Sequence, residues 1–184
     1  MRPMPRFIAV LPLVFYLAGC AVPGTSMSEI SVRGALQSDA GQPLAGASGE
    51  VFLHSAEGLD KLDLAEQRRG DPWLGESMKK IPFTADAQGA FAENLGYFGG
   101  HATCWMFPPI GCHPAENPVM FLRMNAAPDE YYAIQIRNGR FMAFGSDGQV
   151  LPPQQARLSQ VSTHREKGET GKTIDVLTIK MQVK

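Results

Sequence analysis

GALQSDAGQPLAGA, residues 34–47, is the stretch that decides the fold. Asp39 and Gly41 supply the side-chain hydrogen bonding and the positive φ that a tight turn needs. Pro43 fixes one φ, and the small residues 45–47 allow backbone segments to approach closely beneath the turn. The stretch therefore predicts two strands joined by a compact turn, which is a scaffold role.

Alternating apolar and polar residues lie on both sides of this turn. Before it, Ile30, Val32 and Leu36 stand two or four residues apart, which is the period of a half-buried strand. After it come further short runs, and Asp86-Ala87-Gln88-Gly89 reads as a tight hairpin turn between two of them. The expected strands after the turn lie at 50–54, 81–84 and 90–92.

The second half of the chain continues the pattern. Asn138-Gly139 stands between two alternating runs and is a strong hairpin signal. Seven or eight strands with turns at short spacing predict an all-β fold, an antiparallel β-sandwich. The expected strands here lie at 119–124, 131–137, 140–144, 156–164 and 173–183.

Two of these segments carry a family resemblance. Residues 34–47, followed by Val51-Phe52-Leu53 and by FTADAQGAF at 83–91, resemble the carboxypeptidase-regulatory-like family. The resemblance implies a transthyretin-like (prealbumin-like) antiparallel β-sandwich of about seven strands, in a family whose members are mostly non-catalytic modules. We expect one such domain over residues 29–184, with a short helix at 59–69 inside an insertion.

The N-terminus reads as an export signal. Arg2 and Arg6 precede an apolar run from Phe7 to Leu17, which is too short to cross a bilayer as a helix and is interrupted by Pro12. The run ends in Leu17-Ala18-Gly19-Cys20, which resembles the lipobox of bacterial lipoproteins.

The lipobox resemblance implies processing and anchoring. A signal peptidase would remove the signal peptide, residues 1–19, and Cys20 would carry the acyl chains at the start of a lipidated tether over residues 20–28. Ala21 after the cysteine favours the outer membrane, with the domain on the periplasmic side or at the surface. Membrane lipid is thus the first expected partner.

Composition bears on the remaining partners. Of 17 basic residues Arg2 and Arg6 leave with the signal, while all 18 acidic residues stay, so the mature chain has a net charge of about −3. A chain of this charge is a poor partner for nucleic acid. An envelope protein remains a possible partner.

Two cysteines remain once Cys20 is acylated. We predict a disulfide between Cys104 and Cys112, because exported cysteines usually oxidise and the bond would close a loop of about nine residues. A copper or zinc site is the alternative, since thiolate, thioether and imidazole groups suit these metals. Its ligands would come from His101, Cys104, Met106, Cys112 and His113.

The loop between these cysteines holds four large apolar residues beside two prolines and a glycine. We expect this composition to exclude a regular helix or strand. The apolar side chains then either plug one end of the sandwich or contact a partner, as anchors on a loop held in shape by the disulfide. They are Trp105, Met106, Phe107 and Ile110.

The sequence holds no G-x-S-x-G, no H-E-x-x-H and no glycine-rich phosphate loop. His54 and His164 lie in or beside alternating runs and are expected to be ordinary strand residues. We therefore expect a non-enzymatic, cofactor-free lipoprotein of the outer membrane that serves binding or envelope assembly. The alternative is a periplasmic binder of copper or zinc, or of carbohydrate if Trp73 and Trp105 share one exposed face.

Overall fold

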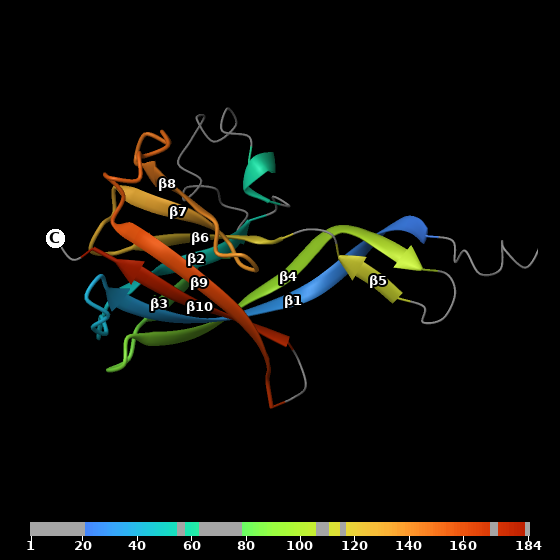
Figure 1. Ribbon diagram of the computed structural model, residues 1–184, viewed down its shortest axis with the longest axis horizontal. Helices are drawn as coiled ribbons and strands as arrows, with labels where there is room; N and C mark the ends of the chain where they lie inside the picture. The colour runs from blue at the N-terminus through green and yellow to red at the C-terminus, as the bar shows by residue number, and fades with distance from the viewer. Residues whose placement is uncertain are drawn as a thin grey trace, which may run out of the picture. The chain divides into compact units, whose positions relative to one another are not determined.

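The computed structural model describes residues 21–54, 58–62, 79–105, 111–114, 117–169 and 173–182. Within these ranges the chain forms ten strands and one 3₁₀ turn, η1, and no α-helix. The strands are β1 (Ala21–Ser38), β2 (Ser48–His54), β3 (Ile81–Thr84), β4 (Ala90–Trp105), β5 (Gly111–Pro114), β6 (Val119–Met124), β7 (Glu130–Gln135), β8 (Phe141–Gly145), β9 (Leu158–Lys167) and β10 (Thr173–Met181) (Figure 1).

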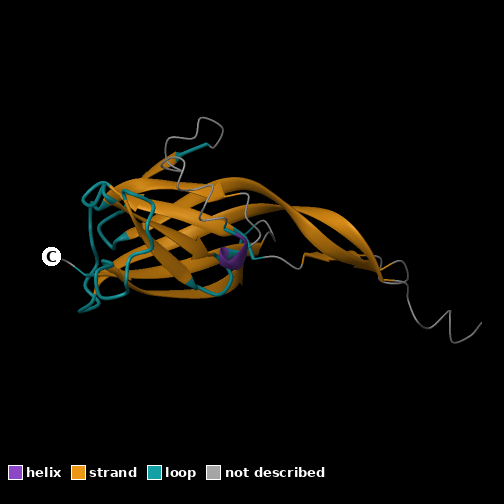
Figure 2. Ribbon diagram, turned by 90° about the horizontal axis from the view of Figure 1, so that it is seen from above, coloured by secondary structure: helices purple, strands orange, loops and turns teal. Residues whose placement is uncertain are grey.

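The strands form two five-stranded sheets. One has the order β5-β4-β1-β10-β9 and the other the order β3-β2-β6-β7-β8. Strands, drawn in orange in Figure 2, make up most of the described chain. The second sheet is antiparallel throughout, whereas β1 and β10 in the first sheet run parallel. The expected all-β sandwich is confirmed, with ten strands in the described residues in place of about seven.

The chain divides into two compact units. The first comprises residues 1–27 and 99–116, and among the described residues it holds the beginning of β1, the end of β4 and all of β5. The second comprises residues 28–98 and 117–184 and contains the sandwich core. Residues 99–116 thus group apart from the rest of the single domain that we expected over 29–184.

The core of the second unit follows the alternation seen in the sequence. Ile30, Val32 and Leu36 of β1 have exposed fractions of 2%, 1% and 0%, so one face of the strand is buried. Phe83 and Phe91 stack within the same cluster, with ring centroids 4.2 Å apart. Full burial of side chains of this size contributes roughly 1.5–3 kcal/mol each, which makes this cluster a principal source of stability.

A second apolar cluster lies on the other face of β6 and β7. Phe121 and Tyr131 lie in this cluster, while Leu122 and Tyr132 belong to the main core, so both strands are buried on both faces. The 3₁₀ turn η1 (Leu59–Lys61) supplies part of the cover through Leu59. A helix was expected at 59–69, but the 3₁₀ turn ends at Lys61 and Leu62 has an extended backbone, so no helix runs through Leu62; residues 63–70 lie outside the described residues.

Two predicted turns are confirmed. In the turn between β3 and β4, Oδ1 of Asp86 accepts hydrogen bonds from the backbone N–H groups of Gln88 (2.8 Å) and Ala90 (2.9 Å), and Gly89 has φ 73°. The turn is as tight as predicted, but it is not the expected hairpin, because β3 and β4 belong to different sheets and the turn links them. In the β7–β8 hairpin, Oδ1 of Asn138 accepts from the N–H of Arg140, and Gly139 has φ 69°. Both glycines adopt the left-handed conformation that other residues avoid.

Two features differ from expectation. Residues 21–28, which we expected to form a tether, are part of β1, because β4 lies beside β1 and provides backbone partners despite Pro23 and Gly24. The parallel pairing of β1 with β10, from Val32 opposite Asp175 to Ser38 opposite Met181, also departs from a purely antiparallel sandwich. Strand partners distant in the sequence decide both features.

Candidate functional site

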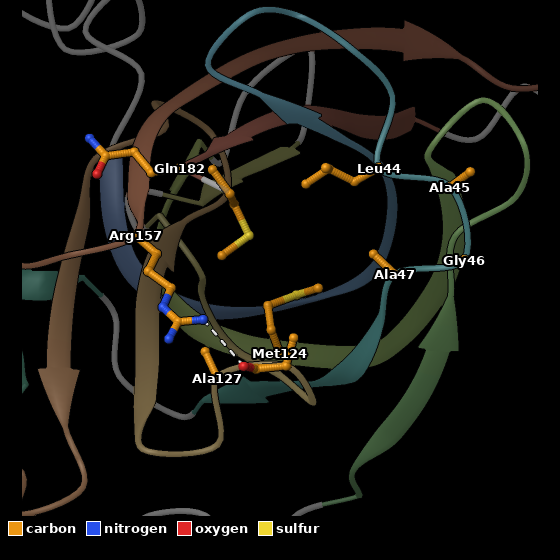
Figure 3. A pocket seen from close by; sticks show the side chains of 10 residues that line it. Leu44, Ala45, Gly46, Ala47, Met124, Ala127, Arg157 and Gln182 are labelled. Carbon is orange, nitrogen blue, oxygen red and sulfur yellow. Dashed lines mark hydrogen bonds between the residues drawn. The ribbon is translucent and has the colours of Figure 1, made fainter. Parts of the chain in front are cut away.

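A pocket opens at one end of the sandwich in the second unit, with a volume of about 340 Å³. Four separate segments build it: the β1–β2 turn, the β6–β7 turn, the residue before β9, and the end of β10 (Figure 3). The lining residues are Leu44, Ala45, Gly46, Ala47, Met124, Ala126, Ala127, Arg157, Met181 and Gln182.

The β1–β2 turn forms the wall seen on the right of Figure 3. Gly46 has φ 71°, and its N–H donates to the carbonyl oxygen of Ala85 at 3.0 Å, which holds the turn against the connection between β3 and β4. The N–H of Ala47 donates to the carbonyl oxygen of Leu44 at 3.3 Å. Since Ala45 and Ala47 carry only methyl groups and Gly46 carries no side chain, the turn leaves open space in front of it.

Buried apolar side chains continue the wall. Met124 and Ala127 in the β6–β7 segment and Met181 at the end of β10 are only 4–5% exposed. Methionine is flexible and polarizable, so it adapts to apolar groups of different shape. This part of the pocket is suited to hydrocarbon.

Arg157 is the one charged residue among the ten that line the pocket. Its Nη1 donates to the carbonyl oxygen of Ala126 at 3.2 Å (Figure 3), and its Nε lies 3.8 Å from Oε2 of Glu130. The backbone N–H of Arg157 donates to Oε1 of Glu130 at 2.7 Å. The side chain is held from two sides while about a third of its surface, 35%, stays exposed.

A buried tyrosine supports this arrangement from behind. The hydroxyl of Tyr132 donates to Oε1 of Glu130, which is the same oxygen that accepts from the N–H of Arg157. Burial, together with the hydrogen bond to Glu130, raises the pKa of Tyr132 well above its usual range. Tyr132 therefore stays protonated and remains a donor to the carboxylate.

The two predicted disulfide residues are brought together by their strands. In the antiparallel pairing of β4 with β5, Cys104 lies opposite Cys112. Directly opposite residues in such a pair have Cα atoms about 4.5–5.5 Å apart, which falls within the range that a disulfide spans. The register is thus compatible with the bond, which stays a prediction.

The backbone corrects our expectation for the loop around these cysteines. Trp105 is the last residue of β4, and Gly111 and Cys112 begin β5, so regular strand extends into the segment from both sides. The β4–β5 pairing allows this, because the prolines and most of the bulky residues fall in the short connection. Met106, Phe107 and Ile110 lie outside the described residues, as do Cys20 and Trp73.

The histidines that we expected to be strand residues are in strands. His54 ends β2 and is half-buried, with its ring 4.8 Å from that of Phe121, and its burial lowers its pKa. His164 is an exposed residue of β9. Across the described ranges, no three His, Cys, Asp or Glu residues gather closely enough to hold a metal ion. The side chains of the alternative metal site at 101–113 lie outside the description.

Sequence reasoning missed the pocket. It assigned Leu44 to Ala47 a scaffold role, and it gave no part to Arg157 or Met181. The run of small residues was a weak signal for open space, but nothing in the sequence joins four segments that lie far apart along the chain.

The chain matches no family model and no curated protein. Among solved structures it is similar to 3-chlorocatechol 1,2-dioxygenase from Rhodococcus opacus 1CP, with 11% identity over 95% of this chain and 78% of that one and a TM-score of 0.34. It is also similar to catechol 1,2-dioxygenase from Acinetobacter radioresistens (11% identity, 86% of this chain, TM-score 0.32) and from Pseudomonas arvilla C-1 (10% identity, 84% of this chain, TM-score 0.29).

This chain spans about half the length of the latter two enzymes, 53% and 51%. At these TM-scores the likeness assigns neither a fold nor an activity. Within the part of the chain that the structure describes, no helix has the length and apolarity needed to cross a membrane.

Proposed function

We propose that the chain is a lipoprotein of the bacterial cell envelope, held at the outer membrane by acyl chains on Cys20. Its β-sandwich would act as a non-catalytic module for binding or envelope assembly. Two observations support the proposal, one from the N-terminus and one from the pocket.

The order of features at the N-terminus supports the anchor. The apolar run and the box Leu17-Ala18-Gly19-Cys20 are followed at once by Ala21, the first residue of β1. Removal of residues 1–19 therefore leaves every described strand intact. Several acyl chains, at about 0.8 kcal/mol for each buried CH₂ group, would hold the mature chain far more firmly than a single chain.

The chemistry of the pocket supports binding over catalysis and is the observation that carries the module's role. Its lining has one arginine and one glutamine, and it has no serine, cysteine, histidine or carboxylate. Acyl transfer and hydrolysis need a nucleophile or a general base within reach of the bound molecule. The lining can hold a ligand but offers neither group.

Acylation is tested by metabolic labelling with an alkyne analogue of palmitate. The wild-type chain should take up the label and fractionate with the outer membrane, and Cys20→Ala should take up none. Cys104→Ala is the matched control, because it also removes one cysteine but should keep the label. An unlabelled wild-type chain whose intact mass includes residues 1–19 would overturn the proposal.

A further inference from the structure

We propose that the pocket at the end of the sandwich binds a small amphiphilic carboxylate, an apolar chain of about eight carbons that ends in a carboxylate group. The apolar body would lie against Met124 and Met181, and the carboxylate would bind the guanidinium of Arg157. This specifies the binding role proposed above and holds whether or not Cys20 is acylated.

The contacts of the Arg157 guanidinium favour a ligand with an anionic head group. Nε faces Glu130 and Nη1 donates to the backbone of Ala126, so both are engaged on the protein side. The guanidinium offers five N–H donors in a rigid fork, and these two contacts leave donors for a ligand. An arginine held in place in this way loses little freedom when it binds a carboxylate.

The carboxylate of Glu130 does not fully neutralise the positive charge of Arg157. Its Oε1 accepts from the Tyr132 hydroxyl and from the Arg157 backbone N–H, and the ion pair with the Arg157 side chain is long, at 3.8 Å. The side chain of Glu130 is 10% exposed, whereas that of Arg157 is 35% exposed. Glu130 therefore acts as a support that positions Arg157, and the positive charge is presented outward.

Arg157 and Gln182 carry the only polar side chains among the ten lining residues, and most backbone N–H groups of the lining are already engaged. The backbone N–H groups of Leu44, Ala47 and Ala127 already donate to carbonyl oxygens of the fold. The N–H of Gly46 donates to Ala85 and that of Gln182 to Arg157. A bound peptide would need free backbone groups along its length, which this wall does not supply, whereas a hydrocarbon chain needs none.

The volume sets the size of the ligand. Pockets for small molecules start at roughly 300 Å³, so the 340 Å³ here is at the small end. A water-sized group takes about 30 Å³, so the pocket holds about ten non-hydrogen atoms. Octanoate has about that number and combines an apolar chain with one carboxylate, so it is a suitable probe.

The methyl groups of the two lining methionines allow binding to be observed at the pocket itself. The full-length protein is labelled with ¹³C at its methionine methyl groups, placed in lipid nanodiscs and titrated with octanoate. The resonances of Met124 and Met181 should shift and saturate, while that of Met120, a core residue outside the pocket lining, should not. Octan-1-ol should bind more weakly, because it lacks the charge.

Variants at Arg157 and Ala126 separate the contribution of the ligand's head group from that of the cavity. Arg157→Gln should weaken octanoate binding by about ten- to hundredfold and remove the preference over octan-1-ol, while Arg157→Lys should keep the preference. Ala126→Phe should block both probes, because Ala126 is an exposed lining residue with room to fill. Arg140→Gln is the matched control, since it removes the same charge from an exposed arginine outside the lining.

Several results would overturn the proposal. They are an absence of shifts at Met124 and Met181, equal affinity for octanoate and octan-1-ol in the wild-type protein, and unchanged binding in Arg157→Gln. Failure of acylation at Cys20 would overturn only the anchor, because this titration does not depend on it.

Discussion

The hydroxyl of Tyr132 donates a hydrogen bond to Oε1 of Glu130, and the two residues are only 0% and 8% exposed. This pair stands directly behind Arg157, which lines the pocket. A buried carboxylate requires hydrogen-bond donors, and this one uses a tyrosine hydroxyl and a backbone N–H. The pair that supports Arg157 is therefore also part of the buried core, and the stability of the core depends on it.

Replacing Tyr132 with phenylalanine should lower the free energy of unfolding by about 1–3 kcal/mol, because Glu130 loses a donor while it stays buried. Urea denaturation at neutral pH measures this. Tyr97→Phe removes a hydroxyl from a side chain that is 69% exposed and should change stability by less than about 0.5 kcal/mol. Equal losses in the two variants would contradict the role given to the buried pair.

His54 should make the protein less stable in acid. Burial lowers its pKa in the folded state below the ordinary value of 6.5, so the unfolded chain binds a proton more readily. The contribution of His54 is present above pH 6.5 and is lost as the pH falls from there toward the folded pKa.

Thermal midpoints of the wild-type protein and His54→Gln, measured across this pH range, test the effect. The wild-type midpoint should fall more steeply toward acid than that of the variant. His164→Gln, at an exposed position on β9, is the matched control for losing one imidazole. Parallel curves for the wild-type protein and His54→Gln would refute the assignment.

Gly34 should tolerate no side chain, for reasons of space. A methyl group there would lie 2.0 Å from Cε1 of Phe91, whose ring is stacked on Phe83. Gly34→Ala should lower the free energy of unfolding by about 1–3 kcal/mol, as overpacked cores do. Chemical denaturation gives the value.

The clash can be separated from other effects by a second substitution. In the background of Phe91→Leu, which removes the ring, Gly34→Ala should cost clearly less than in the wild-type protein. The same cost in both backgrounds would mean that the contact with Phe91 is not the cause.

The predicted disulfide between Cys104 and Cys112 should stabilise the protein by about 2.5 kcal/mol on the chain-entropy model, because the closed loop is short. Cys104→Ser/Cys112→Ser should lower stability by about this amount, measured with and without reductant. Reductant should destabilise the wild-type protein and leave the double variant unchanged. Two free thiols in the unreduced, denatured wild-type protein would contradict the bond.

Local sequence patterns were sufficient to predict much of the fold. The period-two alternation of Ile30, Val32 and Leu36 predicted a strand with one buried face, and the turns at 86–89 and 138–139 are where the glycines indicated. The local conformation of these features depends on residues close together in the chain, whose preferences act whatever the rest of the molecule does. That the turn at 86–89 links two sheets and does not form a hairpin was not encoded locally.

Strand partners could not be predicted in the same way. Residues 21–28 contain Pro23 and Gly24 and carry no clear alternation, yet they belong to β1 because β4 lies beside it. The parallel pairing of β1 with β10 likewise joins the two ends of the described chain. Hydrogen bonds between distant strands outweigh weak local preferences.

The sequence by itself determined the all-β class and the main turns, because each is encoded by neighbouring residues. Only the tertiary structure decided the pocket, since it brings the β1–β2 turn, Met124, Arg157 and Met181 to one end of the sandwich. The physical reason is that a cavity is space left between packed segments. Its shape and charge depend on the pairing of strands that no local pattern specifies.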